Sequence, residues 1–195
     1  MPSLRKASTY SKMKVLPYTR ISRKKSKSYI KVVPPQKIVK FTMGNTQLYN
    51  QGAFPHIITV ITTENVQIRH NALEAVRQNI HRRLDKDFSG QYYFKVVPFP
   101  HHIQRENKML TGAGADRMQT GMQLSFGKCV GKAALLKKGQ KILFLALANE
   151  KILLKTRECL RQVKPKLPCH IKILYEYKPV EVKEQAELQT DSNAD

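Results

Sequence analysis

The sequence lacks tryptophan, contains three cysteines and has no apolar run long enough to span a membrane. A membrane helix needs about 20 consecutive apolar residues, and the amino terminus also lacks the shorter apolar stretch of a signal peptide. Cys129, Cys159 and Cys169 form no Cys-x-x-Cys pair, so neither a disulfide framework nor a cysteine-rich zinc site is indicated. Together these absences predict a cytoplasmic protein with reduced thiols.

Acidic residues are also scarce. The chain has 14 Asp and Glu against 35 Lys and Arg, which gives a net charge of +21, and no acidic residue precedes Glu64. Such an excess repels itself in a compact fold unless a polyanion neutralises it. Nucleic acid is the natural partner, because each phosphate contact releases counterions. Basic composition alone leaves RNA, DNA and anionic lipid open, but no amphipathic basic helix with a Trp or Phe face favours a membrane.

The charge divides the chain into three parts. Residues 1–35 are basic with weak apolar periodicity, which fits either an extended arm that orders on its partner or a flexible tail with a nuclear-import-like patch. Residues 36–178 carry the periodic segments and are predicted to form a single α+β domain. Residues 179–195 have a net charge of −4 and no apolar pattern beyond Val182, so we expect a disordered acidic tail.

Periodicity within residues 36–178 predicts strands and two main helices. The first helix is expected to begin near Thr63 or Asn65 and to end near Gly90, with Ile68, Ala72, Val76, Ile80 and Leu84 facing inward. This places Arg69, His70, Glu74, Arg77, His81 and Arg82 on the opposite side or its flanks. The second helix follows Asn149 and ends before Pro165. The predicted strands are Lys37–Met43, His56–Thr62, Tyr92–Val97, His101–Arg105, Ile142–Ala148, fully buried, and Ile171–Tyr177, half-buried.

The segment KMLTGAGADRMQTGMQ at residues 108–123 has neither helical nor strand periodicity. Its glycines, Gly112, Gly114 and Gly121, permit close approach of the backbone to a ligand, and Lys108 and Arg117 supply positive charge. No Gly-Lys-Ser/Thr follows, and the third glycine of a dinucleotide fingerprint is missing. A basic glycine-rich loop suits contact with an RNA backbone, although composition alone is equally compatible with a mobile surface loop.

A family resemblance favours the first interpretation. Residues 100–141 (PHHIQRENKMLTGAGADRMQTGMQLSFGKCVGKAALLKKGQK) resemble the universal large-subunit ribosomal protein L-sixteen family, whose archaeal form is called L-ten-e. The likeness also covers Tyr18-Thr19-Arg20, Lys37-Ile38, residues 68–75 (IRHNALEA) and Lys166-Leu167-Pro168, and spans residues 5 to about 178. The basic arm and the sequence of residues 105–109 (RENKM) favour the archaeal and eukaryotic branch.

The resemblance implies a fold and a role. Members of this family fold as an α+β sandwich, here expected as two layers with a mixed, mainly antiparallel sheet, two main helices and an extended basic N-terminal arm. They bind rRNA near the aminoacyl-tRNA site, and their glycine-rich loop reaches toward the peptidyl transferase centre and the tRNAs. The expected partners are therefore large-subunit rRNA, tRNA and neighbouring ribosomal proteins, and the expected role is structural support of translation and subunit assembly.

Charge pattern and resemblance together give the candidate site residues. The predicted rRNA-binding residues are Arg5, Lys6, Arg20, Arg23, Lys24, Lys25, Arg69, His70, Arg77, His101, His102, Arg105, Lys128, Lys132, Lys137, Lys138 and Lys141. The predicted tRNA-corridor loop residues are Lys108, Gly112, Gly114, Arg117, Gly121 and Gln123. The family commonly has Arg, Pro and Thr where this chain has Gln123, Cys129 and Lys132, which suggests a shifted phosphate contact.

An enzyme is the main competing interpretation. His101, His102, Asp116 and Cys129 include possible nucleophiles and bases, but no spacing enforces contact among them, so RNA-facing imidazoles and a buried thiol are favoured. On a strand, His101 and His102 point in opposite directions and do not easily chelate one metal ion. We expect no catalysis, no cofactor and no metal. A free-standing RNA-binding or RNA-modifying protein remains the alternative, although no RNA-recognition signature surrounds Tyr92-Tyr93-Phe94.

Overall fold

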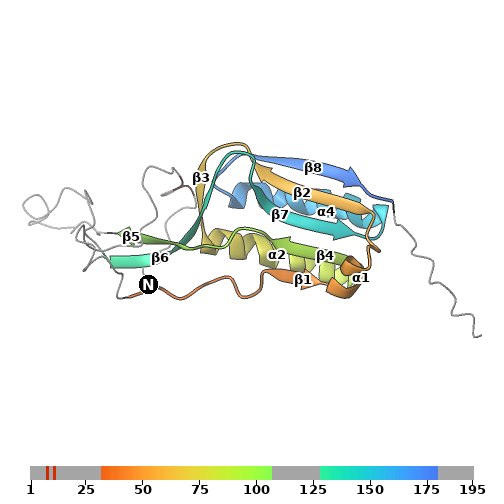
Figure 1. Ribbon diagram of the computed structural model, residues 1–195, viewed down its shortest axis with the longest axis horizontal. Helices are drawn as coiled ribbons and strands as arrows, with labels where there is room; N and C mark the ends of the chain where they lie inside the picture. The colour runs from red at the N-terminus through yellow and green to blue at the C-terminus, as the bar shows by residue number, and fades with distance from the viewer. Residues whose placement is uncertain (1–7, 9–10, 12–31, 107–127, 180–195) are drawn as a thin grey trace, which may run out of the picture.

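The computed structural model describes residues 8, 11, 32–106 and 128–179, and these contain two antiparallel sheets and two long helices (Figure 1). The five-stranded sheet has the order β1-β4-β7-β2-β8, and the three-stranded sheet has the order β3-β6-β5. The elements in chain order are β1 (Thr42–Gly44), α1 (Thr46–Asn50), β2 (His56–Thr62), β3 (Val66–Arg69), α2 (His70–Phe88), β4 (Tyr92–Val96), β5 (His102–Glu106), β6 (Lys128–Leu136), β7 (Lys141–Leu147), α4 (Glu150–Val163), the 3-10 helix η2 (Lys164–Lys166) and β8 (Ile171–Tyr177). The predicted α+β layering with a mainly antiparallel sheet and two main helices is confirmed.

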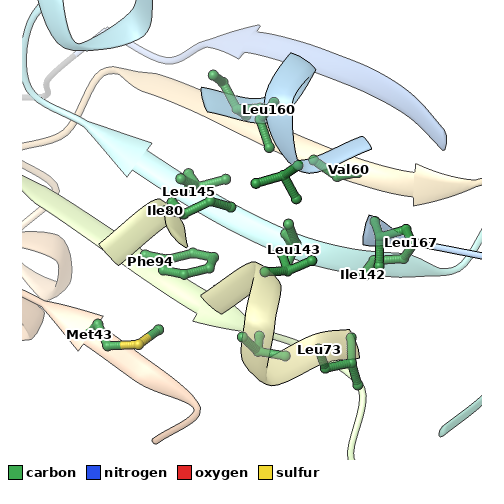
Figure 2. Close-up of a cluster of buried hydrophobic side chains, with 14 of the residues drawn as sticks. Met43, Val60, Leu73, Ile80, Phe94, Ile142, Leu143, Leu145, Leu160 and Leu167 are labelled. Atoms are coloured by element: carbon green, nitrogen blue, oxygen red, sulfur yellow. The ribbon is translucent and has the colours of Figure 1, made fainter. Parts of the chain in front are cut away.

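The core lies between the five-stranded sheet and helices α2 and α4. Alternate residues of the central strand β7 point toward the helices, and Leu143 and Leu145 meet Ile80 of α2 and Leu160 of α4 there (Figure 2). All four side chains are at most 1% exposed, and each contributes about 2 kcal/mol by leaving water. The predicted burial of this strand on both faces is confirmed, because Ala146 on the other face is also fully buried.

An aromatic cluster under α1 covers that other face. Tyr93 of β4 stacks on Tyr49 of α1 with ring centroids 4.1 Å apart, and Phe144 of β7 lies edge-on to Tyr49 at 5.8 Å. The chain reaches α1 through Gly44, which has a φ of +86°. A Cβ at this position would overlap the carbonyl oxygen of Tyr92, so β1 and β4 approach too closely for any other residue.

The prediction of a helix beginning at Thr63 or Asn65 is wrong. Residues 66–69 form β3, which pairs with residues 133–136 of β6, and α2 begins at His70. Ile68 is buried on the strand and lies four residues before Ala72. Its position therefore also fits the apolar spacing of the helix, which is why the sequence predicted the helix too early. The helix ends at Phe88, close to Gly90, where the sequence predicted its end. Gly90 has a φ of +76°, a conformation that favours glycine after a helix.

Two further strand predictions need correction. Lys37–Met43 was expected as a strand, but only Thr42–Gly44 pairs with β4, because the amide of Val39 instead donates to the Glu74 carboxylate of α2 at 3.4 Å. Ile171–Tyr177 does form β8, but Tyr177 is 60% exposed. β8 is an edge strand, and only Ile171 and Leu174 are partly buried, so the predicted half-burial of the whole strand is wrong.

A bulge in β2 and β7 separates an apolar from a basic residue. Val60 pairs with Leu143 and Ile61 pairs with Lys141, so Ile142 is the extra residue between them. Ile142 turns into the core beside Leu167 (Figure 2) and is fully buried. Lys141 remains exposed.

One buried ion pair ties α2 to the N-terminal strand region. Arg77 donates from Nε and Nη2 to the Glu74 carboxylate at 2.8 and 2.6 Å, and its Nη1 lies 3.3 Å from the sulfur of Met43. The hydrogen bonds from Arg77 hold the pKa of Glu74 below its ordinary value, against the opposing effect of burial. Glu74 therefore stabilises the fold above its unfolded-state pKa, and this contribution is lost as the pH falls through its folded-state pKa.

We predict that Arg77→Met destabilises the protein by about 3 to 5 kcal/mol, because it leaves a buried carboxylate without its partner. Urea unfolding at neutral pH measures this change. The matched control is Arg82→Met, an exposed position on the same helix, which should change stability by less than about 0.5 kcal/mol. Equal losses for the two variants would contradict the importance of the buried pair.

Candidate nucleic-acid interface

Among the predicted rRNA-binding residues whose side chains the structure describes, four are buried and four, namely His101, Lys137, Lys138 and Lys141, are exposed. Arg69, His70, Arg77 and His102 are 8%, 4%, 8% and 4% exposed. The sequence placed the first three on the side of a helix opposite its apolar stripe or on the flanks, and their expected exposure is wrong. Arg69 lies on β3, His70 lies against Gly131 of β6, and Arg77 is enclosed by Glu74 and Met43. A phosphate reaches these four side chains only if neighbouring groups move, so the exposed residues are the more accessible candidates.

His70 lies against the backbone of the three-stranded sheet. A Cβ on Gly131 of β6 would lie 3.1 Å from Nε2 of His70, so the absence of a side chain at Gly131 makes room for the imidazole. Burial, together with the smaller effect of the charges of Lys37, Arg69 and Lys132, lowers the pKa of His70 to about 4. Burial and then the charge of His101 lower the pKa of His102 to about 4 as well. Both imidazoles are therefore neutral at physiological pH.

Three of the four exposed residues gather at the turn between β6 and β7. Lys137 and Lys138 occupy the turn, and Lys141 opens β7. Ile61 of β2 pairs with Lys141 on one side and with Lys172 of β8 on the other. These two lysines therefore lie in one row across three strands, about 10 Å apart by the usual strand spacing. We call Lys137, Lys138, Lys141 and Lys172 the turn cluster. Lys172 was not among the predicted contacts, although its alternation with apolar neighbours marked it as exposed.

Hydrogen bonds fix this turn to the connection between β2 and β3. The Lys138 amide donates to Oδ1 of Asn65 at 2.9 Å, and the Gly139 amide donates to the carbonyl of Thr62 at 2.8 Å. The Lys137 amide donates to Oε1 of Gln140 at 2.8 Å, and Gly139 has a φ of +84°. The backbone that carries these lysines is thus held in place before any partner binds, which reduces the entropy lost on binding.

The glycine-rich segment joins two paired strands. Glu106 of β5 is opposite Lys128 of β6, so residues 107–127 leave and re-enter the three-stranded sheet at one point (Figure 1). The predicted loop residues Lys108, Gly112, Gly114, Arg117, Gly121 and Gln123 lie outside the described residues, as do Arg5, Lys6, Arg20, Arg23, Lys24 and Lys25 of the arm. The backbones of Arg105 and Lys128 belong to the two strands, Lys132 is half-buried and His101 is exposed.

The residues considered for catalysis do not assemble into a site in the described part of the chain. His101 is exposed, His102 is buried and Cys129 pairs with Arg105 across β5 and β6, whereas Asp116 lies outside the described residues. Burial raises the pKa of the Cys159 and Cys169 thiols, which lowers their reactivity. Within residues 32–106 and 128–179, no group of three or more His, Cys, Asp or Glu is placed to hold a metal ion. None of the described helices is long and apolar enough to cross a bilayer.

A basic α+β fold whose exposed lysines gather on a hydrogen-bonded turn is suited to a polyanionic partner, and comparison with known proteins identifies the family. The family model described as Ribosomal protein L16p/L10e matches residues 17–174. The chain belongs to this family, as the resemblance of residues 100–141 predicted.

Archaeal proteins are among its relatives. The large ribosomal subunit protein uL16 of Hyperthermus butylicus is 47% identical over 153 residues, which cover 78% of this chain and 79% of that protein. The uL16 of Methanospirillum hungatei is 42% identical over 153 residues, covering 78% and 87%. The uL16 of Methanococcus aeolicus is 38% identical over 174 residues, covering 88% and 94%.

The buried histidines predict a specific pH response. Since their folded-state pKa of about 4 is below the ordinary value of 6.5, their contribution to stability is complete above about pH 6.5 and is lost as the pH falls toward 4. We predict that the double variant His70→Gln, His102→Gln loses less stability between these pH values than the wild type, measured by urea unfolding. The control His170→Gln changes an exposed imidazole that does not act on either buried histidine and should retain the wild-type profile. If the double variant lost as much stability between these pH values as the wild type, the two imidazoles would not resist protonation in the folded protein.

Proposed function

We propose that this protein is a structural constituent of the large ribosomal subunit that binds rRNA and supports translation and subunit assembly. The observation that carries the proposal is the match of one ribosomal protein family to residues 17–174, together with relatives named as large ribosomal subunit proteins. The net charge of +21 supports it, because rRNA supplies the phosphates that neutralise such a chain. The role follows from binding, and no catalytic step is assigned to the chain.

The turn cluster is the proposed contact that the structure describes in most detail. Lysine is a mobile point charge that suits phosphate better than base edges, so contacts of Lys137, Lys138, Lys141 and Lys172 position the protein without reading sequence. Their spacing along a fixed turn and across three strands allows several phosphates of one strand to be neutralised together. His101 and Lys132 extend the proposed surface toward β5 and β6.

The finer proposal concerns the glycine-rich segment. We propose that the protein lies near the aminoacyl-tRNA site and that residues 108–123 point toward the peptidyl transferase centre and the tRNAs. Support comes from the motif itself and from the pairing of Glu106 with Lys128, which fixes both ends of the connection at the edge of a sheet. Lys108 and Arg117 are the proposed phosphate contacts. The arm at residues 1–35 is proposed to lie along rRNA beside residues 36–178, and neighbouring ribosomal proteins are further proposed partners.

Sedimentation tests the central claim. The full chain, expressed in cells of a related archaeon or added to subunits that lack its homologue, should migrate with large subunits through a gradient at physiological salt. Its release should rise steeply with salt, because each phosphate contact contributes a slope of roughly −0.7 to −0.9 to the dependence of log affinity on log salt. Migration only in the free fractions would overturn the proposal and favour a free-standing RNA-binding protein.

Deletion of residues 111–120 tests the proposed role of the glycine-rich segment. The deletion lies between paired strands and removes none of the core residues described above, so folding and rRNA docking should be retained while translation by the resulting ribosomes is impaired. Gradient sedimentation and a translation assay on the same ribosomes measure the two effects. A chain that no longer folds, or ribosomes with wild-type activity, would contradict this part of the proposal.

A further inference from the structure

A groove of about 790 Å³ lies in the helical layer, on elements outside the turn cluster. The second half of α2 forms one wall, and α4 and η2, which pack beside α2, form the other. Its lining consists of Ala75, Gln78, Asn79, Arg82, Arg83, Lys86, Asp87, Lys155 and Lys166. Small-molecule sites are mostly apolar, whereas Ala75 is the single apolar residue here.

Positive charge in the groove exceeds what its acids neutralise. Five of the lining side chains are cationic and one, Asp87, is a carboxylate. Asp87 and Glu158 lie 3.8 and 3.9 Å from the ammonium group of Lys155, so the available acids serve one lysine. Among the described residues, Arg82, Lys86 and Lys166 have no carboxylate within 4.0 Å. The fold thus holds repelling cations together in a concave surface, which an anion stabilises.

The walls of the groove are rigid because the same helices form the core. The inner residues of α2, including Val76, Ile80 and Leu84, are fully buried, and Leu160 of α4 meets them from the other helix. Arg82 and Lys86 are four positions apart, so they project from one side of α2 a helical turn from each other. Oδ1 of Asn79 is buried in the same wall without a hydrogen-bond partner among the described residues, and it gains one if the amide turns toward a ligand.

We propose that this groove binds the sugar-phosphate backbone of an rRNA strand, in addition to the contact at the turn cluster. The inference rests on the proposed ribosomal function and assigns a second binding site to it. Arginine and lysine without competing acids neutralise successive phosphates, and the groove's length along α2 follows a strand better than it fits a single ion. The lack of an apolar or aromatic lining argues against a protein partner, whose interface would need an apolar centre.

The test compares two triple variants of the full chain with equal loss of charge. The groove variant carries Arg82→Gln, Lys86→Gln and Lys166→Gln, and the control carries Lys95→Gln, Lys151→Gln and Lys178→Gln, which are exposed and lie outside both the groove and the turn cluster. Binding to transcribed large-subunit rRNA is measured over a range of potassium chloride concentrations. The groove variant should bind about tenfold or more weakly than the wild type. The slope of its log affinity against log salt should become shallower by about 0.7 to 0.9 for each phosphate contact removed. The control should change much less in both respects.

A charge-preserving variant, Arg82→Lys, Lys86→Arg and Lys166→Arg, should retain most of the binding, and thermal unfolding shows whether each variant is folded. Wild-type binding by the groove variant, or equal losses in both glutamine variants, would overturn the groove as a site. Failure of the proposed function is seen separately, because it appears in the wild-type chain as no preference for large-subunit rRNA over an unrelated RNA of equal length.

Discussion

The apolar layer between the five-stranded sheet and helices α2 and α4 is the constraint on which the molecule depends. A chain with 35 Lys and Arg and 14 Asp and Glu folds only if this layer outweighs the repulsion among its cations. The layer is built from the inward side of β7 and β4 and from one stripe of each helix, and most of its members are fully buried. Arg77 enters it only with Glu74 as a partner. The lysines of the turn cluster and the cations of the helical groove lie outside this layer.

Both surfaces proposed to meet rRNA use rigid backbone. The turn cluster is anchored through Asn65 and Thr62, and the groove is formed by helices whose inner sides belong to the core. Phosphate contacts carry little sequence information, so the accuracy of docking depends on where the scaffold places the charges. Two such surfaces on different elements allow one small protein to hold two segments of RNA at a fixed separation, which is a physical basis for a bracing role.

The sequence predicted the elements whose signals are local. Runs rich in β-branched and aromatic residues predicted β2 and β4, a continuous apolar run predicted β7, and Asn149 and Pro165 marked the two ends of α4. The motif at residues 100–141 predicted the family. The sequence did not predict β3 and β6, because each depends on the other across a long separation and Ile68 also fits a helical pattern. The mistaken helix start placed Arg69 and His70 in solvent. Arg77 was misplaced for another reason, because its contacts with Glu74 and Met43 leave no mark in the helical pattern. Arg82 was expected on the outer side of its helix, but Lys155 and Lys166 join it only through the packing of α4 and η2 on α2.

The pairing of Glu106 with Lys128 also affects how the family can diverge. A connection whose ends are held at one point adds only about 0.6 kcal/mol to the cost of folding for each doubling of its length. Insertions and deletions between β5 and β6 therefore leave the free energy of the core almost unchanged. Natural selection can remodel residues 107–127 for a different neighbourhood while the scaffold stays as it is, so variation in length between relatives should concentrate at this junction.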